Sequence, residues 1–314
     1  MTEKMGIELV HFSDCGAFRK TNQDAYLVRI ASARFGNLAM AAVCDGMGGL
    51  KCGEVASAAV MNTLQQWFDR ELPRIAESSE INRDMLFGSW GRYLAGVHKV
   101  LKTYGSRNGI ALGTTLSVLL MTEKHYYIAQ VGDSRIYLDD TQMTVRLTQD
   151  QTLADRELLA GRITEAEYRT HPGQHTLLQC IGSRDVIPVY SDGILPPKGA
   201  FLICSDGFYH HTTDEQIYSA LNTPGGREAL KTQLLTLGDL ARNCGEKDNM
   251  TVAALRWDGF HDMPAKTEIL LNPEDEDSAP ETLVSVTYAS ALPADLTEGM
   301  QENSDTQTIF LEGN

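Results

Sequence analysis

Short apolar runs separated by turn-forming residues fill much of the first 45 positions and return after residue 113. Runs of this length with glycine, asparagine or aspartate at their ends are typical of β-strands. We predict strands over residues 7–12, 25–30, 38–44, 114–122, 125–131, 135–138, 201–204 and 250–257.

Between these runs, apolar residues recur at the spacing of a helix. Over 54–71 they fall on one face, and 83–104 shows a similar pattern that Gly88, Gly91 and Gly96 weaken. We also predict short helices over 155–160 and 164–168, and longer ones over 214–221 and 227–243. The pattern therefore indicates a mixed protein, but it does not by itself arrange the strands into sheets.

Acidic residues are concentrated at the C-terminal end. The 314 residues carry a formal net charge of −15, and 42% of them are hydrophobic, which is enough for a substantial core. Positions 258–314 hold 13 acidic residues and one basic residue, and 272–280 has the composition of a linker. We expect one domain over 1–257 and an acidic, disordered C-terminal tail over 258–314.

Composition excludes several classes of function. Nucleic-acid binders need clustered lysine and arginine, so we expect no nucleic-acid partner, and a metal-dependent nuclease is disfavoured. No run reaches the roughly 18 apolar residues of a membrane helix. The first eight residues lack the apolar stretch of a signal peptide. Six scattered cysteines indicate neither a disulfide framework nor a zinc site. We expect a cytoplasmic protein with no membrane partner.

Four short acidic motifs follow one another along the chain. They are Asn22-Gln23-Asp24, Asp45-Gly46-Met47-Gly48-Gly49, Ser205-Asp206-Gly207 and Asp248-Asn249. Carboxylates from several strand ends suit hard cations such as Mg²⁺ and Mn²⁺, and glycines let the backbone, such as the Gly46 carbonyl, approach the metal. Taken alone, Asp45-Gly46 and Asp248-Asn249 are better explained as ordinary turns, and Ser205-Asp206-Gly207 is as compatible with a turn or a helix N-cap as with a metal site. Together they favour a metal-dependent hydrolase.

Other polar residues carry weaker signals. Arg19 is suited to bidentate contact with a phosphate, although an exposed basic loop is the simpler interpretation of Arg19 taken alone. The eight histidines show no metal-ligand spacing, and we assign them no role.

Taken in order, these motifs resemble those of the type 2C family of metal-dependent protein phosphatases, in particular its bacterial branch. The resemblance runs from about residue 6 to residue 257. Besides Arg19 and the four acidic motifs, it rests on Gly113-Thr114-Thr115, Gly132-Asp133-Ser134-Arg135 and Thr148-Gln149-Asp150-Gln151. Single motifs of this kind are weak, but the whole set in register is highly specific.

The resemblance implies an α+β fold of two packed antiparallel β-sheets flanked by helices on both sides, an α/β/β/α sandwich with metals in a cleft at one end. It implies that Asp45 bridges two Mn²⁺ or Mg²⁺ ions and that the Gly46 carbonyl binds one of them. By the same resemblance, Asp206 and Asp248 complete the ligand set of the other ion. Asp133, together with Asp206, matches the position of a third ion in bacterial members.

The resemblance also implies catalytic roles. Arg19 matches the arginine that binds the substrate phosphate, and Asp24 resembles an outer-sphere residue that holds a metal-bound water. Gln23 stands where many members carry glutamate. Met47 stands where animal members carry a histidine suggested as general acid, but the bacterial branch commonly has methionine there. Residues 157–172 resemble the mobile flap beside the cleft, which influences substrate choice.

We therefore predict a protein serine/threonine phosphatase, in which a metal-activated water hydrolyses phosphoserine or phosphothreonine. Expected partners are phosphorylated proteins and a cognate bacterial Ser/Thr kinase whose action it reverses. Thr282, Thr306 and Thr308 resemble kinase targets that forkhead-associated domains then bind, so the tail is a candidate site for such a partner. The alternative is a non-catalytic phosphopeptide-binding or scaffold protein on the same fold, against which the complete acidic motifs argue.

Overall fold

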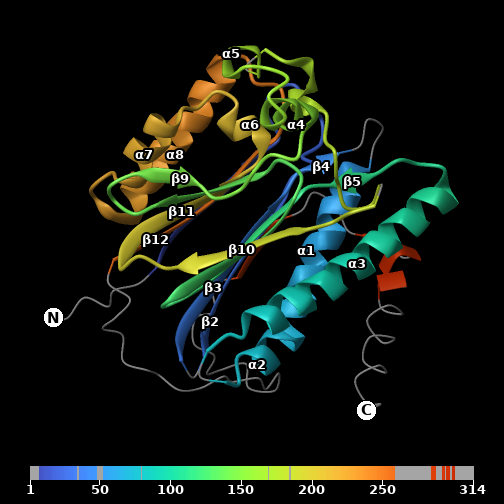
Figure 1. The fold of residues 1–314 in the computed structure, drawn as a ribbon, viewed down its shortest axis with the longest axis horizontal. Coiled ribbons are helices and arrows are strands. Elements are labelled where there is room, and N and C mark those ends of the chain that lie inside the picture. The colour runs from blue at the N-terminus through green and yellow to red at the C-terminus, as the bar shows by residue number, and fades with distance from the viewer. Residues whose placement is uncertain are drawn as a thin grey trace.

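Two antiparallel β-sheets pack face to face, with helices on their outer sides (Figure 1). The computed structural model describes residues 7–258 except 34, 48–51, 79, 169 and 184, and also residues 284–287, 292–293, 295–297 and 299–300. The α/β/β/α sandwich predicted from the sequence is confirmed.

The two sheets differ in size. The five-stranded sheet consists, in spatial order, of β1 (Glu8–Asp14), β12 (Met250–Asp258), β11 (Lys198–Cys204), β8 (Arg135–Asp139) and β9 (Thr144–Arg146). The six-stranded sheet consists of β10 (Val189–Ile194), β7 (His125–Val131), β6 (Leu116–Thr122), β3 (Gly36–Cys44), β2 (Ala25–Ala33) and β13 (Val284–Thr287). A separate ladder joins β4 (Gly46–Met47) to β5 (Gly113–Thr114).

Strand β3 is buried on both of its faces, which explains its unbroken apolar run. Side chains alternate across a strand, so successive residues of β3 enter different cores. Ala39, Ala41 and Val43 face the other sheet, where they join Phe201, Ile203 and Leu255. Met40, Ala42 and Cys44 face the helices. The C-terminal end of β3 is thereby fixed from both sides.

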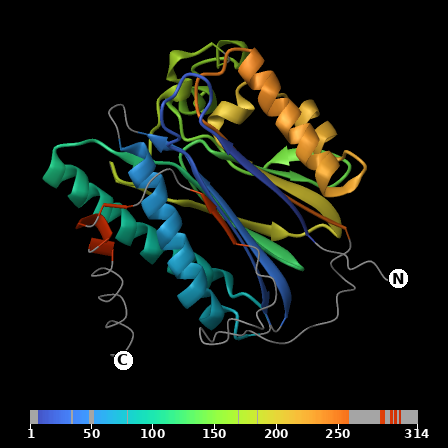
Figure 2. The same cartoon turned by 180° about the vertical axis from the view of Figure 1, so that it is seen from behind.

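Each sheet has its own layer of helices (Figures 1 and 2). The six-stranded sheet is covered by α1 (Gly53–Arg70), α2 (Leu72–Ile75) and α3 (Arg83–Asn108). The five-stranded sheet is covered by α7 (Asp214–Leu221) and α8 (Gly226–Asn243). Shorter elements gather near one end of the sandwich: α4 (Leu153–Leu159), α5 (Glu165–Tyr168), the 3₁₀ helix η1 (Pro172–His175) and α6 (Asp206–Tyr209).

Capping residues in the sequence set both ends of helix α3. The Asn82 side chain accepts a hydrogen bond from the Met85 amide (3.0 Å) at the N-cap. Gly109 ends the helix in the left-handed region, with φ of 64°. The indole of Trp67 on α1 donates to the Ser89 hydroxyl of α3 (2.8 Å), which joins the two helices inside the core.

Every strand and helix predicted from the pattern overlaps an observed element. The pattern missed the strands β4, β9, β10 and β13 and the short helices α2, α6 and η1. Strand β10 contains Ser191, Asp192 and Gly193, which are poor strand formers, and it pairs only with β7 at the sheet edge. Apart from Tyr190, which stacks on Phe87, β10 is held mainly by its backbone ladder. Among the described helices, none combines the length and apolarity needed to cross a bilayer.

Parts of the predicted tail lie against the domain. Strand β13 pairs antiparallel with β2, from Val284 opposite Arg29 to Thr287 opposite Tyr26. Leu296 (1% exposed) is buried and belongs to the hydrophobic cluster that includes α1 and α3. Most of the segment predicted to be a disordered tail, including all three candidate threonines, lies outside the described residues.

Candidate functional site

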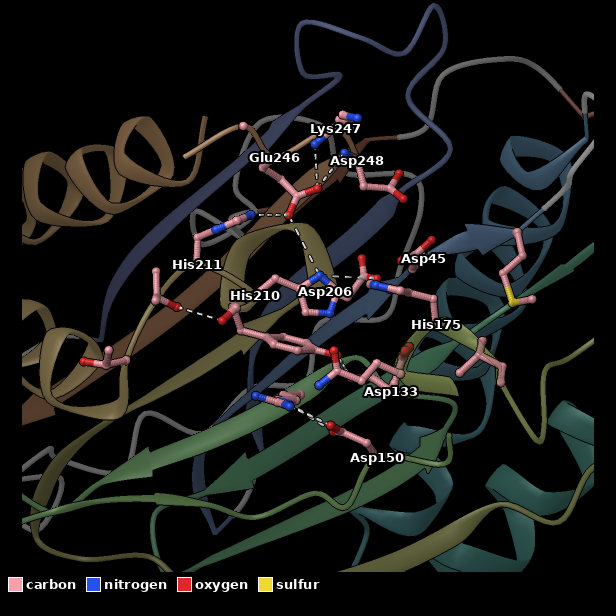
Figure 3. Close-up of a pocket in the computed structure, with 18 of the residues that line it drawn as sticks. Asp45, Asp133, Asp150, His175, Asp206, His210, His211, Glu246, Lys247 and Asp248 are labelled. Atoms are coloured by element: carbon pink, nitrogen blue, oxygen red, sulfur yellow. Dashed lines mark hydrogen bonds and ion pairs between the residues drawn. The ribbon is translucent and has the colours of Figure 1, made fainter. Parts of the chain in front are cut away.

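A cavity of about 1280 Å³ opens at one end of the sandwich (Figure 3). Acidic side chains reach it from strand ends: one follows β3, one follows β11, one lies between β7 and β8, and one precedes β12. Neighbouring strands of packed sheets end at a common edge, so these sequence-distant positions meet. The predicted residues that line the cavity are Arg19, Asp45, Gly46, Asp133, Asp206 and Asp248.

The backbone of Asp45 is held by two threonines. The Asp45 amide donates to the Thr115 hydroxyl (2.9 Å), and its carbonyl accepts from the Thr115 amide and the Thr114 hydroxyl (2.9 Å each). These bonds give a structural reason for the Gly113-Thr114-Thr115 motif. They fix the main chain and leave the carboxylate free to act in the cavity.

Gly46 occupies a position where no larger residue fits. An added Cβ would lie 2.3 Å from the Gln23 carbonyl oxygen and 2.3 Å from the Gly53 carbonyl oxygen. The Gly46 amide also donates to the Gln23 carbonyl (3.1 Å). The main chain of β4 is thus packed between the Gln23 loop and the start of α1. The next two glycines of the motif, 48 and 49, lie outside the described residues.

Asp24 lies behind the cavity rather than in it. It is 2% exposed, and it is not among the residues that line the cavity. Its carboxylate accepts a hydrogen bond from the Ser205 hydroxyl (2.7 Å), and that hydroxyl accepts from the Thr251 amide (2.9 Å). Burial raises the pKa of Asp24 to about 7. Asp24 therefore connects β2 to the segment that carries Asp206.

The acidic cluster has the electrostatics of a cation site. Burial raises the pKa of Asp45, Asp133 and Asp206, and the neighbouring carboxylates raise it further. Oδ1 of Asp206 is buried without a hydrogen-bond partner among the described residues. Bound divalent cations would relieve this repulsion and satisfy the buried oxygen, and all-oxygen ligands suit Mg²⁺ and Mn²⁺. The residues present therefore fit such ions.

Arg19 lies at the rim of the cavity. Its guanidinium donates to Oδ2 of Asp248 (2.7 Å), and the two side chains are 49% and 35% exposed. Partial burial acts to lower the pKa of Arg19, but the Asp248 carboxylate holds it above its usual value. Asn249 anchors the same loop, because its side chain accepts from the Gln23 amide (2.9 Å). Arg19 is therefore placed to meet an anion that enters the cavity.

A second network explains two further motifs of the sequence. Arg135 donates to Asp150 (Nη2 to Oδ2, 2.6 Å), and its guanidinium stacks 3.5 Å from the centre of the Tyr209 ring. The Tyr209 hydroxyl donates to the Asp133 carbonyl (3.2 Å). The Gly132-Asp133-Ser134-Arg135 and Thr148-Gln149-Asp150-Gln151 motifs thus form one wall of the cavity and hold Asp133 in place.

Several cavity residues had no role in the sequence interpretation. His175, His210, His211 and Glu246 all line the cavity. His210 follows Asp206 by four positions, which is one helical turn, and this spacing was the available signal. Burial lowers the pKa of His210. His175 lies in the chain segment between β9 and β10. Its sequence neighbours give no sign that this segment folds back to the cavity.

Known proteins resemble this chain in sequence and structure. The family model described as "Protein phosphatase 2C" matches residues 19–235. Protein phosphatase PhpP of Streptococcus pneumoniae is 32% identical over 251 residues, which cover 79% of this chain and 96% of the relative.

Solved structures of bacterial serine/threonine phosphatases also resemble this chain. The serine/threonine phosphatase PstP/Ppp of Mycobacterium tuberculosis superposes with a TM-score of 0.66 at 26% identity, covering 80% of this chain and 99% of that one. The catalytic domain of PstP in complex with 2 manganese ions gives a TM-score of 0.64 at 26% identity, covering 80% of this chain and 98% of that one.

Proposed function

The chain belongs to the protein phosphatase 2C family, and from this premise we infer that it removes phosphate from phosphoserine and phosphothreonine in proteins. The observation that carries this conclusion is the convergence of Asp45, Asp206 and Asp248 on one cavity beside Arg19. The names of the relatives support an enzyme and give no support to the alternative of a non-catalytic phosphopeptide-binding protein.

We propose that Asp45, the Gly46 carbonyl, Asp206 and Asp248 hold two divalent ions, and that Asp133 and Asp206 hold a third. A relative crystallised with manganese supports Mn²⁺ as one of these ions, and Mg²⁺ accepts the same oxygens. Divalent ions supply Lewis-acid activation of water and neutralise charge at the phosphoryl group. The protein contributes a fixed arrangement of ligands.

The protein's own side chains bind and orient the substrate phosphate and position the metal ligands. Arg19 orients the phosphate by donating to its oxygens, as it donates to Asp248 here. Asp24 acts as a positioning residue, because it is buried and touches the cavity only through Ser205 and its neighbours. Met47 lines the cavity but has no proton to give, so the departing seryl or threonyl oxygen takes its proton from solvent in the cavity.

The substitution Asp45→Asn tests this proposal. It removes a buried negative charge from the cluster without changing side-chain size, so we expect kcat/KM for a phosphothreonine peptide with Mn²⁺ to fall by at least about 100-fold. Asp24→Asn is expected to lower kcat with little change in KM. Wild-type turnover in the Asp45→Asn variant would refute the proposed metal site.

We also propose that the natural substrates are products of a Ser/Thr kinase and that the tail recruits a forkhead-associated domain. Thr282, Thr306 and Thr308 stand in acidic surroundings, and a phosphate there would create a docking group for arginine. After incubation with the cognate kinase, mass spectrometry is expected to show phosphothreonine in the tail. Its absence there would remove the idea.

We propose that the reaction takes place in the cytoplasm, where thiols stay reduced. All six cysteines lie in the described part of the chain, and none of them forms a disulfide bond there.

A further inference from the structure

Two histidines meet Asp206 inside the cavity. One ligand atom each from His175, Asp206 and His210 lie within 4.8 Å of one another. Nδ1 of His210 is 4.0 Å from Oδ2 of Asp206. The rings of His175 and His210 form an edge-to-face pair with centroids 4.9 Å apart. Figure 3 shows both rings directed toward the Asp206 carboxylate. These separations leave room for one ion between the three groups.

The three side chains are brought together by fixed backbone. His210 follows α6 directly, and its amide donates to the carbonyl of Asp206 (3.0 Å), so the helical turn sets their spacing. His175 ends η1. That turn is held at its start by the His171 side chain, which accepts from the Gly173 amide (3.0 Å), and just after its end by the Leu153 amide, which donates to Thr176 (2.9 Å).

The shared carboxylate has capacity left for a ligand. Asp206 Oδ1 is buried without a hydrogen-bond partner among the described residues. A buried, unpartnered carboxylate oxygen is costly unless a cation or donor reaches it. His210 approaches the other oxygen, Oδ2, so the two oxygens of this carboxylate offer separate positions to cations.

The ligand set differs in kind from the oxygen cluster on the other side of Asp206. Two imidazoles and one carboxylate are a set that Zn²⁺ uses with an open fourth position. Imidazole suits Zn²⁺, Cu²⁺ and Ni²⁺ and is disfavoured by Mg²⁺, and zinc binds such sites more tightly than Mn²⁺. The two halves of the cavity therefore select different metals.

We propose that His175, Asp206 and His210 form a separate mixed-ligand site for a transition ion of the Zn²⁺ class, which shares Asp206 with the oxygen cluster. Because one carboxylate serves both sites, the ion at the histidines competes for Asp206. As a consequence that rests on the proposed function, Zn²⁺ at this site lowers Mn²⁺-dependent hydrolysis. The site makes the enzyme responsive to the ratio of the two metals.

His211 gives the chain a matched control. Its Nε2 lies 3.4 Å from Oε2 of Glu246, and it is not part of the three-residue cluster. Glu246 in turn accepts from the amides of Lys247 (2.6 Å) and Asp248 (2.9 Å), which fixes it to the loop. A histidine beside the site, in the same cavity, can therefore be removed without removing one of the three ligands.

Co²⁺ is the probe for the test, because imidazole-rich coordination gives it visible absorption bands, which Zn²⁺ then displaces. Wild-type protein is titrated beside His175→Ala, His210→Ala and His211→Ala. We expect one such Co²⁺ equivalent in wild type and in His211→Ala. Affinity for it is expected to fall by about 100-fold or more in the other two variants, since loss of a ligand should exceed loss of an outer partner.

Equal Co²⁺ binding in all four proteins, or no such equivalent in wild type, would overturn the site. Circular dichroism verifies folding. If His210→Ala does not fold, ¹⁵N spectra of the wild-type histidine rings replace it, and the His175 and His210 signals must shift when Zn²⁺ is added. Asp45→Asn separates the two proposals: it is expected to lose hydrolysis and keep the histidine site. A Co²⁺ equivalent in a protein that never hydrolyses phosphate supports the site and refutes the function.

Discussion

At the scale of single residues, the cavity concentrates negative charge where the fold offers little to balance it. Asp133 is buried, Asp45 and Asp206 are half-buried in the same cavity, and the Arg19 guanidinium is paired with Asp248. Burying like charges opposes folding unless a cation or proton joins them. The same repulsion would favour the divalent ions that we propose for this cluster, so the metal-free protein is expected to be less stable than the metal-bound protein.

Arg19→Lys tests the phosphate contact. Lysine keeps the charge but loses the planar fork that donates two bonds to one phosphate. A hydrogen bond to a charged group contributes about 1.5–3 kcal/mol, so we expect kcat/KM to fall by roughly 10- to 100-fold. Steady-state kinetics on a phosphothreonine peptide measures this. Lys20→Ala, next to it but outside the cavity lining, is the control and is expected to behave as wild type. An unchanged kcat/KM in Arg19→Lys would remove Arg19 from the site.

The sequence identified residues that line the cavity where chemistry and local pattern coincide. Asp45 and Asp206 each follow an apolar strand and precede glycine, so their type and place are both visible in the sequence. His175 has no such local mark, since only the folded path between β9 and β10 brings it to Asp206. Asp24 belongs to a recognisable motif, but it is connected to the cavity only through its hydrogen bond with Ser205. That contact between distant parts of the chain is visible only in the folded structure.

At the scale of elements, the short β4–β5 ladder positions the centre. Gly46 pairs with Thr114 and lies between the Gln23 and Gly53 carbonyls, so strand, loop and helix meet at one residue. The neighbouring atoms are backbone and cannot move independently. The proposed metal ligand, the Gly46 carbonyl, is thus held by packing of main chain against main chain.

Gly46→Ala is therefore expected to lower the free energy of unfolding by about 1–3 kcal/mol and to weaken Mn²⁺ binding. Gly88→Ala is the matched control, because Gly88 lies exposed on α3 and its nearest neighbour to an added Cβ is Arg92 Nη1 at 3.9 Å. Alanine there should stabilise the protein by about 0.5–1 kcal/mol. Urea denaturation of the metal-free proteins gives both values. A Gly46→Ala protein as stable as its parent would contradict the close packing.

The helices and strands that could be predicted are those whose own buried residues leave a clear apolar pattern in the sequence. Strand β3 is apolar on both faces, and α3 carries its own caps, so both are visible in the sequence. Strand β10 exposes Val189 (51%) and Ile194 (78%) and depends on its ladder with β7. An edge strand that is held by backbone pairing leaves little hydrophobic pattern to detect.

At the scale of the whole molecule, stability and chemistry occupy different regions. One core lies between the sheets, and two more lie beneath the helix layers. The cavity is confined to the end where strands terminate, so substitutions there should leave these cores intact. The arrangement of two sheets with metals at one end came from the family resemblance, because pairing order between distant strands is not encoded in local periodicity.

The central claim is that carboxylates from separate strands bind paired divalent ions. Crystals grown with Mn²⁺ and measured at the manganese absorption edge test it most directly. We expect anomalous peaks in the cavity for two ions that Asp45 bridges, with the Gly46 carbonyl on one and Asp206 and Asp248 on the other, and a third peak beside Asp133 and Asp206. Well-ordered crystals with no peak beside Asp45 and Asp206, or with manganese bound only elsewhere, would contradict it.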